Sequence, residues 1–504
     1  MKTSAFVLSA LAAAPLVAAA PAAAPLVESN KLRRVLLRSE LRARAEELHA
    51  IAVRNGGNRY WGTAGHWDTL SWIEAQIDTN YYNVERQYFN ITEQTSLGGW
   101  VTIDGVAYEN VNGMAGSPNK TVTAPIINVK NFGCVASDYP ESIAGKIALV
   151  ARGDCYFAVK NVVAQTAGAI GIVVYNNDDT NFQPGLGYPK DYNATEFIPA
   201  AFITKSDGRA LVTRLGDGTL PATVKTLTSQ TSGISANLIA TTKGGDQNQI
   251  ITVGAHTDSV KAGPGINDNG SGTIAQIEVA KALTKYSVNN AIRFCWWGAE
   301  EVGLVGSRYY ASHIPEEEAA KIVMNLNFDM LASPNYMFGI YDGDASDFES
   351  PYATNGSALI EQTFIDFFKE VGKPSVPTAF SGRSDYQGFL QINIPAGGLF
   401  TGAEEIMSAE EAVLFNGKAG VAYDVCYHQA CDDVKNLNFD AFITNTKSMA
   451  DAVAKYGRSI AGFPFPRPAV KLTPRGPLSE TMVARPHLGK HSGQGGCSNA
   501  NVEA

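Results

Sequence analysis

The chain has 504 residues, 45% of them hydrophobic and 18% charged, so it can bury a large core divided over roughly two or three domains. Its formal charge of -9 is spread along the sequence without long blocks of one sign, and no basic patch with interleaved aromatic residues is present. These features exclude nucleic acid as an expected partner, and the charges are interpreted as the solvated surface of a soluble protein.

Residues 1–20 have the features of a secretory signal peptide. Lys2 precedes an apolar run over Ala5–Leu16 that is too short to span a bilayer, and small residues follow around Val17–Ala20. No later segment reaches about 18 uninterrupted apolar residues, so no membrane span is expected. Six cysteines suit an oxidising compartment. We therefore expect a secreted, extracellular protein.

Sequons for N-glycosylation are consistent with this route. Four of them are expected to carry glycans, at Asn90, Asn119, Asn193 and Asn355. Asn269 also begins a sequon, but a glycan there would block the loop that contains Asp268, which we expect to be functional. We therefore expect Asn269 to be bare.

Residues 28–118 are predicted to form the first part of the main domain. Within them, residues 28–54 place apolar side chains near helical spacing among Arg and Glu, which indicates an amphipathic helix. Part of this segment could instead be a short propeptide, and the sequence does not decide. A second helix is expected over Tyr60–Ile77, and alternating strands over Tyr88–Gly113.

Residues 119–232 have a different pattern and interrupt one that resumes at Ile250, which indicates an inserted, smaller β-rich domain. No cluster of titratable residues is concentrated there, so we expect this domain to pack against or cover its neighbour rather than to catalyse. Cys134 and Cys155 both lie inside it, which favours a local disulfide bond. The expected elements are strands over Ala124–Val129, Gly145–Ala151, Ala169–Tyr175 and Ala200–Thr204, and a helix over Ala158–Thr166.

Residues 233–460 are predicted to form the second part of the main domain, with the alternating strands and helices of an α/β fold. An apolar run beginning at Ile250 ends in His256, and Asp258 follows two positions later. A loop containing Asp268 then leads into a helical pattern over Ile274–Leu283.

Two further strands are followed by acidic residues. Ala291–Trp297 precedes Glu300 and Glu301, and Ile322–Phe328 precedes Asp329. The remaining elements are a helix over Ser357–Val371, a strand over Ile392–Phe400, a segment over Tyr423–Asp433 that carries His428, and a closing helix over Ala441–Tyr456. Residues 461–504 are predicted to be a flexible tail.

In a parallel sheet, the carboxyl ends of these strands meet at one edge, where ligands bind in open α/β folds. Taken singly, each acidic or imidazole residue has an ordinary explanation: Asp268 could cap a helix, and Glu300 with Glu301 could form an exposed turn. Their coincidence at one edge favours a site for two zinc ions. The residues that would meet there are His256, Asp268, Glu300, Glu301, Asp329 and His428.

The same segments resemble the M28 family of zinc aminopeptidases, which has secreted fungal and bacterial members. The similarity runs over H-x-D with NDNGSG, GAEEVGLVGS, NFDM and CYHQACD, and the insertion resembles the protease-associated (PA) domain. It covers most of residues 40–456, and the set of motifs is specific although no single motif is. The resemblance implies a zinc-exopeptidase fold with a central mixed, largely parallel sheet flanked by helices.

Carried over position by position, the resemblance implies a ligand set for two zinc ions per subunit. Asp268 would bridge both ions. His256 and Asp329 would complete one site, and Glu301 and His428 would complete the other.

The resemblance also implies roles for residues that do not bind metal. Glu300 would be the general base, and this fits the geometry of a strand, where adjacent side chains point apart. Asp258 would accept the second N–H of His256 and so fix its tautomer. Tyr427 would help to stabilise the oxyanion, with simple packing as the alternative.

Cys426 and Cys431 flank His428 closely enough for a disulfide bond that would stiffen this loop. A C-x₄-C zinc site is the competing interpretation, and we disfavour it because no second cysteine pair lies nearby in the sequence. Cys295 is expected to be a buried thiol within a strand.

The predicted activity is hydrolysis of the N-terminal peptide bond of peptides with a free N-terminus, and the resemblance implies a preference for large apolar residues such as leucine. We expect a monomer. One alternative is a carboxypeptidase of the same family, in which Arg383 could hold a terminal carboxylate. The other is a non-catalytic binding ectodomain with a PA domain, which would lack the metal ligands.

Overall fold

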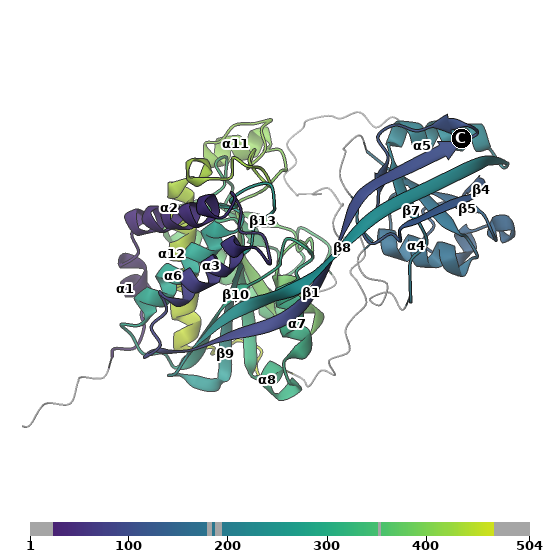
Figure 1. Cartoon of the computed structure of the whole chain (residues 1–504). Helices are drawn as coiled ribbons and strands as arrows, with labels where there is room; N and C mark the ends of the chain where they lie inside the picture. The colour runs from purple at the N-terminus through teal and green to yellow at the C-terminus, as the bar shows by residue number, and fades with distance from the viewer. Residues whose placement is uncertain (1–23, 179–183, 187–193, 351–353, 468–504) are drawn as a thin grey trace, which may run out of the picture.

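The computed structural model describes residues 24–178, 184–186, 194–350 and 354–467. The chain forms two domains, and two long antiparallel strands, β1 (Tyr82–Ile103) and β8 (Thr219–Thr242), run unbroken from one to the other (Figure 1). One continuous sheet passes through both domains in the order β13-β12-β14-β11-β9-β10-β8-β4-β5-β6-β7-β3. The prediction of an α/β fold with a smaller inserted domain is confirmed.

The sheet of the larger domain is mixed and largely parallel. Strand β9 pairs in parallel with β10 on one side and with β11 on the other, and β11 pairs in parallel with β14. Strands β8 and β12 are antiparallel to their neighbours β10 and β14. The bounds are β9 Asp246–His256, β10 Asn290–Trp297, β11 Ile322–Phe328, β12 Gly339–Tyr341, β13 Val376–Thr378 and β14 Ala396–Phe400.

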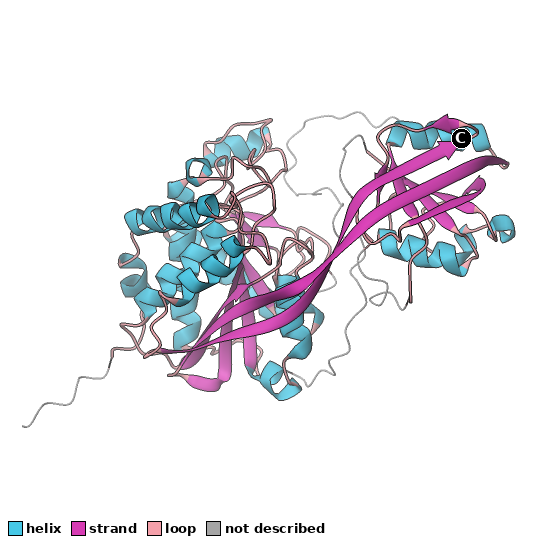
Figure 2. Cartoon of the chain, viewed as in Figure 1, coloured by secondary structure: helices cyan, strands magenta, loops and turns pink. Residues whose placement is uncertain are grey.

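Helices lie on both sides of this sheet (Figure 2). On one side α2, α6, α9 and α12 pack together, and on the other side α10 packs against α7. The helices of the larger domain are α1 Ser29–Arg34, α2 Arg38–Arg54, α3 Ala64–Glu74, α6 Gly270–Leu283, α7 Val305–His313, α8 Glu316–Lys321, α9 Asn355–Glu370, α10 Tyr386–Gln391, α11 Ala409–Phe415, the 3₁₀ turn η4 Val434–Asn436 and α12 Phe439–Arg458.

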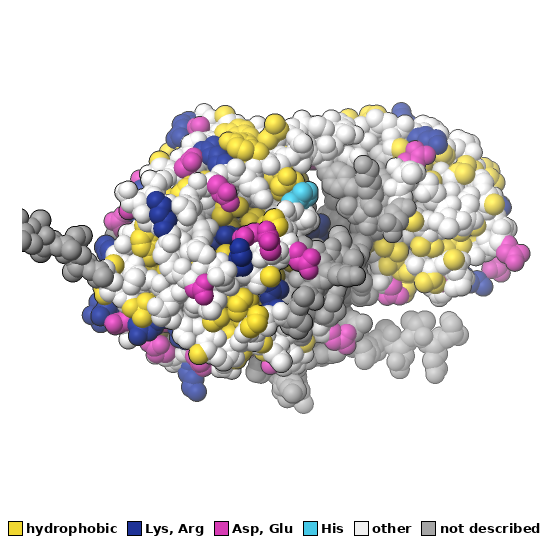
Figure 3. Space-filling model, turned by 90° about the horizontal axis from the view of Figure 1, so that it is seen from below, with side chains coloured by type: hydrophobic (Ala, Val, Ile, Leu, Met, Phe, Trp, Pro, Cys, Tyr) yellow, Lys and Arg dark blue, Asp and Glu magenta, His cyan; other side chains and the backbone are white. Residues whose placement is uncertain are grey.

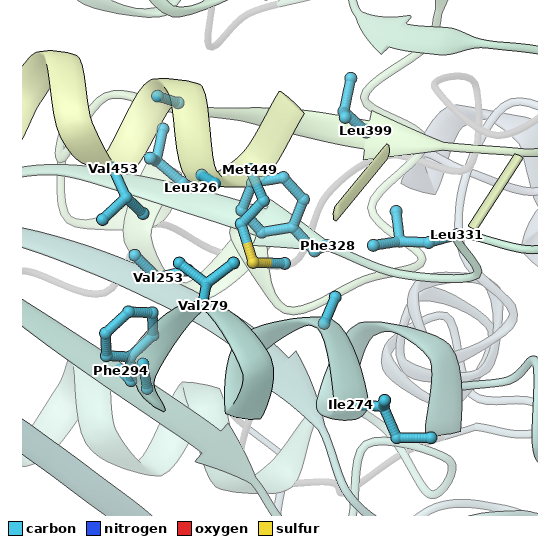
Figure 4. Packing of buried hydrophobic residues seen from close by; sticks show 14 of the residues in the cluster. Val253, Ile274, Val279, Phe294, Leu326, Phe328, Leu331, Leu399, Met449 and Val453 are labelled. Carbon is cyan, nitrogen blue, oxygen red and sulfur yellow. The ribbon is translucent and has the colours of Figure 1, made fainter. Parts of the chain in front are cut away.

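The core follows from the alternation of side chains along the strands. On β10, Phe294 and Trp296 belong to the main hydrophobic cluster, whereas Cys295 and Trp297 belong to a second cluster with Tyr310 of α7. In the main cluster, side chains of β9, β10 and β11 meet those of α6 and α12 (Figure 4). Cys295 is a buried free thiol, as predicted.

The N-terminal helix is divided in two. Helix α1 ends before Val35, and Leu37 is extended and precedes α2. Leu32 and Leu41, one from each helix, are almost completely buried in the main core. This segment is therefore an integral part of the larger domain.

The smaller domain is built on its own parallel strands. Strands β4, β5, β6 and β7 are parallel to one another, and β4 is antiparallel to β8. One hydrophobic cluster lies under α4 and another under α5, a helix that the sequence analysis did not predict. The bounds are β2 Val106–Ala107, β3 Asn112–Gly113, β4 Lys120–Asn128, η1 Ala136–Asp138, η2 Glu141–Ile143, β5 Ile147–Ala151, α4 Phe157–Thr166, β6 Gly171–Tyr175, β7 Ala200–Ile203 and α5 Lys205–Leu215.

Packing of the smaller domain begins before residue 119, where the sequence placed its start. Val101 and Ile103 lie in one cluster with Val122, and Met114 lies in the other cluster. The difference arises because β1 continues from one domain into the other, so the sequence has no turn or linker to mark the boundary. The predicted disulfide bond between Cys134 and Cys155 is present.

The chain end extends into the range predicted as a tail. Phe463 is buried against the main core, and the Arg467 guanidinium donates hydrogen bonds to main-chain carbonyls, among them those of Ala319 and Ile322. Residues 461–467 therefore pack with the larger domain. The predicted signal peptide, Asn193 and the rest of the predicted tail lie outside the described residues.

The surface agrees with the composition. Acidic and basic side chains are interspersed over the face seen in Figure 3, so no patch of one sign dominates it. Within the part of the chain that the structure describes, no helix is both long and apolar enough to cross a membrane. Asn90, Asn119 and Asn355 are exposed. Asn269 is completely buried, and its side chain hydrogen-bonds Gly272 and Phe328, so there is no room for a glycan.

Candidate metal centre

The carboxyl ends of three parallel strands form the floor of the site, as predicted. His256 is the last residue of β9, Glu300 follows β10 after a short turn, and Asp329 follows β11 directly. Ala299, which precedes Glu300, and Met330, which follows Asp329, both have positive φ values, 59° and 51°. His428 has φ 56°. Such left-handed backbone is unfavourable for these residues and is often found at functional sites.

Two groups of potential metal ligands share Asp268. One oxygen of Asp268, Oδ1, lies 3.3 Å from His256 Nε2, and Asp329 Oδ1 lies 3.5 Å from the same nitrogen. The other oxygen, Oδ2, lies 3.2 Å from His428 Nε2, which is 3.1 Å from Glu301 Oε2. In each group, the three ligand atoms lie within 4.8 Å of one another.

Burial and mutual repulsion raise the pKa values of the acidic side chains in and beside these groups. Burial raises the pKa of Glu301 to about 7, and the neighbouring Asp268 adds to this effect. Burial also raises the pKa of Glu300 well above its ordinary value, although His256 opposes the shift. Glu301 Oε1 and Asp329 Oδ1 are buried without a hydrogen-bond partner among the described residues. Carboxylate oxygens and imidazoles in this arrangement fit the ligand preference of zinc.

Asp258 connects His256 to the turn that carries Glu300 and Glu301. His256 Nδ1 lies 3.7 Å from Asp258 Oδ1 and 3.3 Å from the main-chain oxygen of Asp258. The carboxylate also accepts hydrogen bonds from the main-chain N–H groups of Glu300 at 3.0 Å and Glu301 at 3.3 Å. Burial opposes ionisation of Asp258, but His256 and these donors outweigh it and hold its pKa below the ordinary range.

The loop that carries Asp268 is held by residues that the sequence analysis did not single out. Asp432 accepts hydrogen bonds from the main-chain N–H groups of Asn267 at 2.8 Å and Asp268 at 3.0 Å. Asp424 accepts one from the Asn267 side chain at 2.6 Å. Asp432 directly follows Cys431, so its place in the CYHQACD motif was the available signal.

A buried arginine supports the same loop from behind. The Arg59 guanidinium is fully buried and donates to the main-chain oxygens of Thr257, of Pro264 at 2.8 Å and of Gly265 at 2.6 Å. The helix predicted from the sequence begins at Tyr60, and no role was predicted for Arg59. An isolated arginine in a loop carries no signal of burial, because most arginines are exposed.

The side chains of Asp329 and His428 are each held in place. Ser384 Oγ donates to Asp329 Oδ2 at 2.5 Å and accepts from the Asn327 side chain at 2.9 Å. Cys426 and Cys431 form a disulfide bond across the His428 loop, so the alternative of a C-x₄-C zinc site is wrong. Next to Ser384, Asp385 is buried, and burial raises its pKa to about 7.

Tyr427 lies against the second group of ligands. Its ring stacks on that of His428 with 3.8 Å between the ring centroids. Its hydroxyl accepts a hydrogen bond from Arg383 Nη2 at 3.1 Å, and Arg383 forms an ion pair with Glu404 at 2.8 Å. Burial raises the pKa of Tyr427, so its hydroxyl stays protonated and able to donate.

The ligand groups open into a cavity of about 670 Å³. Asp268, Glu300, Glu301, Asp329, Tyr427 and His428 line one part of it. Its other walls include the apolar and aromatic side chains of Met330, Met337, Tyr341, Phe400 and Tyr423. The space therefore combines a metal-binding end with a pocket for an apolar group.

The fold and this site define the class of protein as a metal-dependent hydrolase with an α/β domain. The model of peptidase family M28 matches residues 237–453, and that of the PA domain matches residues 122–211. The chain belongs to peptidase family M28, with an inserted PA domain.

Its relatives among known proteins extend over nearly the whole chain. It is 45% identical to the probable leucine aminopeptidase 2 of Aspergillus fumigatus, over 88% of this chain and 88% of the relative. It is 42% identical to leucine aminopeptidase 2 of Arthroderma otae, over 95% of this chain and 93% of the relative.

Solved structures show the same fold. The aminopeptidase from Aneurinibacillus sp. strain AM-1 superposes with a TM-score of 0.70 at 26% identity, covering 86% of this chain and 96% of that one. The zinc aminopeptidase BSAP from Bacillus subtilis gives a TM-score of 0.56 at 26% identity, over 84% of this chain and 96% of that one.

Proposed function

We propose that this protein is a secreted aminopeptidase with two zinc ions, which removes N-terminal residues such as leucine from peptides. The observation that carries the proposal is the position of Asp268, whose two oxygens face different imidazoles at 3.3 and 3.2 Å. A carboxylate shared in this way is suited to bridging two metal ions. The names of the fungal relatives support leucine as a substrate residue.

Each metal ion would have three protein ligands. His256, Asp268 and Asp329 would hold one, and Asp268, Glu301 and His428 the other. Zinc bound there supplies Lewis acidity and a hydrolytic water with a pKa near neutrality.

Glu300 is the residue best placed to move the proton. It lines the cavity and belongs to neither ligand group, while its main-chain N–H is fixed by Asp258. Its carboxylate would accept a proton from the attacking water and then deliver it to the leaving amine. For this reason the scissile nitrogen must lie beside Glu300.

Tyr427 would stabilise the oxyanion. Its protonated hydroxyl lies at the cavity wall and can donate to developing negative charge. Arg383 donates to the same hydroxyl and so restrains its position.

The contacts of Arg383 also favour the aminopeptidase over the carboxypeptidase. Arg383 would be needed to hold a terminal carboxylate, but it already lies 2.8 Å from Glu404 and 3.6 Å from Glu405. Its charge is thereby compensated. The non-catalytic alternative is disfavoured because both ligand groups are complete and carry buried oxygens without hydrogen-bond partners among the described residues.

Release of free amino acid from leucine-initiated peptides, with and without a chelator, tests the proposal. We expect release that stops on chelation and returns with zinc, with about two zinc ions per chain by elemental analysis. A peptide blocked at its N-terminus should remain intact. Cleavage of the blocked peptide would exclude an aminopeptidase, and absence of zinc after gentle purification would exclude the metal mechanism.

We also propose a location, an oligomeric state and glycosylation sites for the protein. The protein would be secreted and monomeric, with glycans at exposed sequons such as Asn90 and Asn355. Intact mass before and after glycosidase treatment tests the glycans, and light scattering tests the monomer.

A further inference from the structure

Arg308 forms part of the wall of the catalytic cavity. It lies on α7, eight residues after Glu300, and it lines the cavity together with Gly303 and Leu304. Its side chain is held in place by two neutral acceptors. Nη1 donates to the Gly303 carbonyl at 3.4 Å, and Nη2 donates to Gln387 Oε1 at 2.5 Å. Gln387 is itself buried on α10, so this support is rigid.

Among the residues that the structure describes, no carboxylate forms an ion pair with Arg308, and its side-chain hydrogen bonds go to the neutral acceptors of Gly303 and Gln387. Arg383, on another part of the same wall, is paired with Glu404 and Glu405. A guanidinium has five N–H donors, and the two contacts of Arg308 leave several of them available. Arg308 is therefore a fixed cation with unused donors at the cavity wall.

The reaction places the leaving part of the substrate on this side. Glu300 must reach the scissile nitrogen in order to protonate it. The wall next to Glu300 is continuous with Arg308, because the Glu300 carbonyl accepts hydrogen bonds from Gly303 at 2.9 Å and Leu304 at 2.7 Å, and the α7 helix follows. The apolar walls, which include Met337 and Tyr341, come from other elements and suit the side chain of the N-terminal residue.

We propose that Arg308 binds a carboxylate on the residue that follows the scissile bond, so that the enzyme favours peptides with a carboxylate at that residue. This inference rests on the proposed aminopeptidase function. The carboxylate has two possible sources with the same chemistry: the free C-terminus of a dipeptide, or an Asp or Glu side chain in a longer peptide. A guanidinium matches either one, since it binds carboxylates through paired N–H groups.

Two pairs of substrates separate these sources. Leu-Ala against Leu-Ala-amide tests the terminal carboxylate, and Leu-Glu-amide against Leu-Gln-amide tests the side chain. In the wild-type holoenzyme, at least one pair should differ in kcat/KM by roughly threefold to tenfold in favour of the carboxylate, the range expected for a partly exposed charge pair. The difference should shrink as salt is added.

Variants connect the preference to this residue. In Arg308→Gln the ratio within the pair should fall to about one, and Arg308→Lys should retain part of it because the charge remains. Arg214→Gln, which removes an exposed arginine from α5 of the smaller domain, is the matched control and should keep the wild-type ratio.

Equal cleavage within both pairs by the wild type, or a preference that persists in Arg308→Gln, would overturn the proposal. If Arg308→Gln does not fold, the wild-type ratios decide, and a preference unaffected by salt would also overturn it. Failure of the proposed function gives a different result, because the neutral Leu-Ala-amide would then not be cleaved at all.

Discussion

Substitution of Asp258 by asparagine tests how the site is supported, because this carboxylate serves both sides of it. It faces His256 Nδ1 and accepts the main-chain N–H groups of Glu300 and Glu301. An asparagine of the same shape can accept at only one of its two positions, so at least one buried N–H loses its acceptor. The lost negative charge also weakens the orientation of His256.

The expected loss follows from these contacts. One hydrogen bond to a charged group is worth about 1.5–3 kcal/mol, which corresponds to roughly 10- to 150-fold. This agrees with the 10- to 100-fold loss of metal affinity or activity that is usual when a group supporting a metal ligand is changed. We therefore expect Asp258→Asn to lose on the order of 10- to 100-fold in kcat/KM for leucine peptides.

The assay combines initial rates with a zinc titration of the metal-depleted protein. Asp217→Asn, an exposed change in the smaller domain, is the control and should leave both measurements unaltered. If Asp258→Asn retained wild-type rates and wild-type zinc affinity, Asp258 would have no part in orienting the ligands.

Three further predictions concern the base, the buried arginine and the response to acid. Glu300→Gln should lower kcat by about 10²- to 10⁴-fold while the zinc content is retained, and a kcat close to wild type would refute its role as the general base. Arg59→Ala should lower the free energy of unfolding by about 3–5 kcal/mol, because it leaves buried carbonyls without donors, whereas Arg38→Ala at an exposed ion pair should change it by less than about 1 kcal/mol; urea unfolding measures both. Burial lowers the pKa of His66 from 6.5 to about 4, so the unfolded chain binds more protons than the native protein between these pH values. The contribution of neutral His66 to the free energy of unfolding is therefore fully present above pH 6.5 and is lost as the pH falls towards 4. This contribution is about 3 kcal/mol, and His66→Gln should flatten the dependence of unfolding free energy on pH in that range; an unchanged slope would count against the assignment.

The centre of the site could be predicted because apolar strands, and the polar residues that follow them, can be recognised in the sequence. His256, Glu300, Glu301 and Asp329 each follow an apolar β-branched or aromatic run, and parallel strands bring such ends together. His428 was found through its motif rather than through a strand. All five expected ligands meet in the two ligand groups of the structure.

The residues that hold the site in place could not be predicted from the sequence in the same way. Asp432 acts through main-chain N–H groups of residues more than 150 positions earlier, and Arg59 acts through main-chain carbonyls. Contacts to the main chain leave no complementary residue in the sequence that could reveal them. The same limitation applies to Arg308, whose partners are a carbonyl and a glutamine.

The start of the smaller domain has no marker in the sequence for a related reason, since β1 and β8 run from one domain into the other without interruption. The two strands are in register from Tyr82 opposite Thr242 up to Ser96 opposite Thr228, and a bulge follows at Ser96/Gly98. Glu93 therefore lies directly opposite Thr231, at a point before the smaller domain begins. A tight hairpin turn joining the two strands there would remove the entire insertion. Every residue pair between Tyr82/Thr242 and the new turn would remain intact. The β1–β8 strand pair is therefore a suitable place to shorten the chain into a minimal one-domain form of the enzyme.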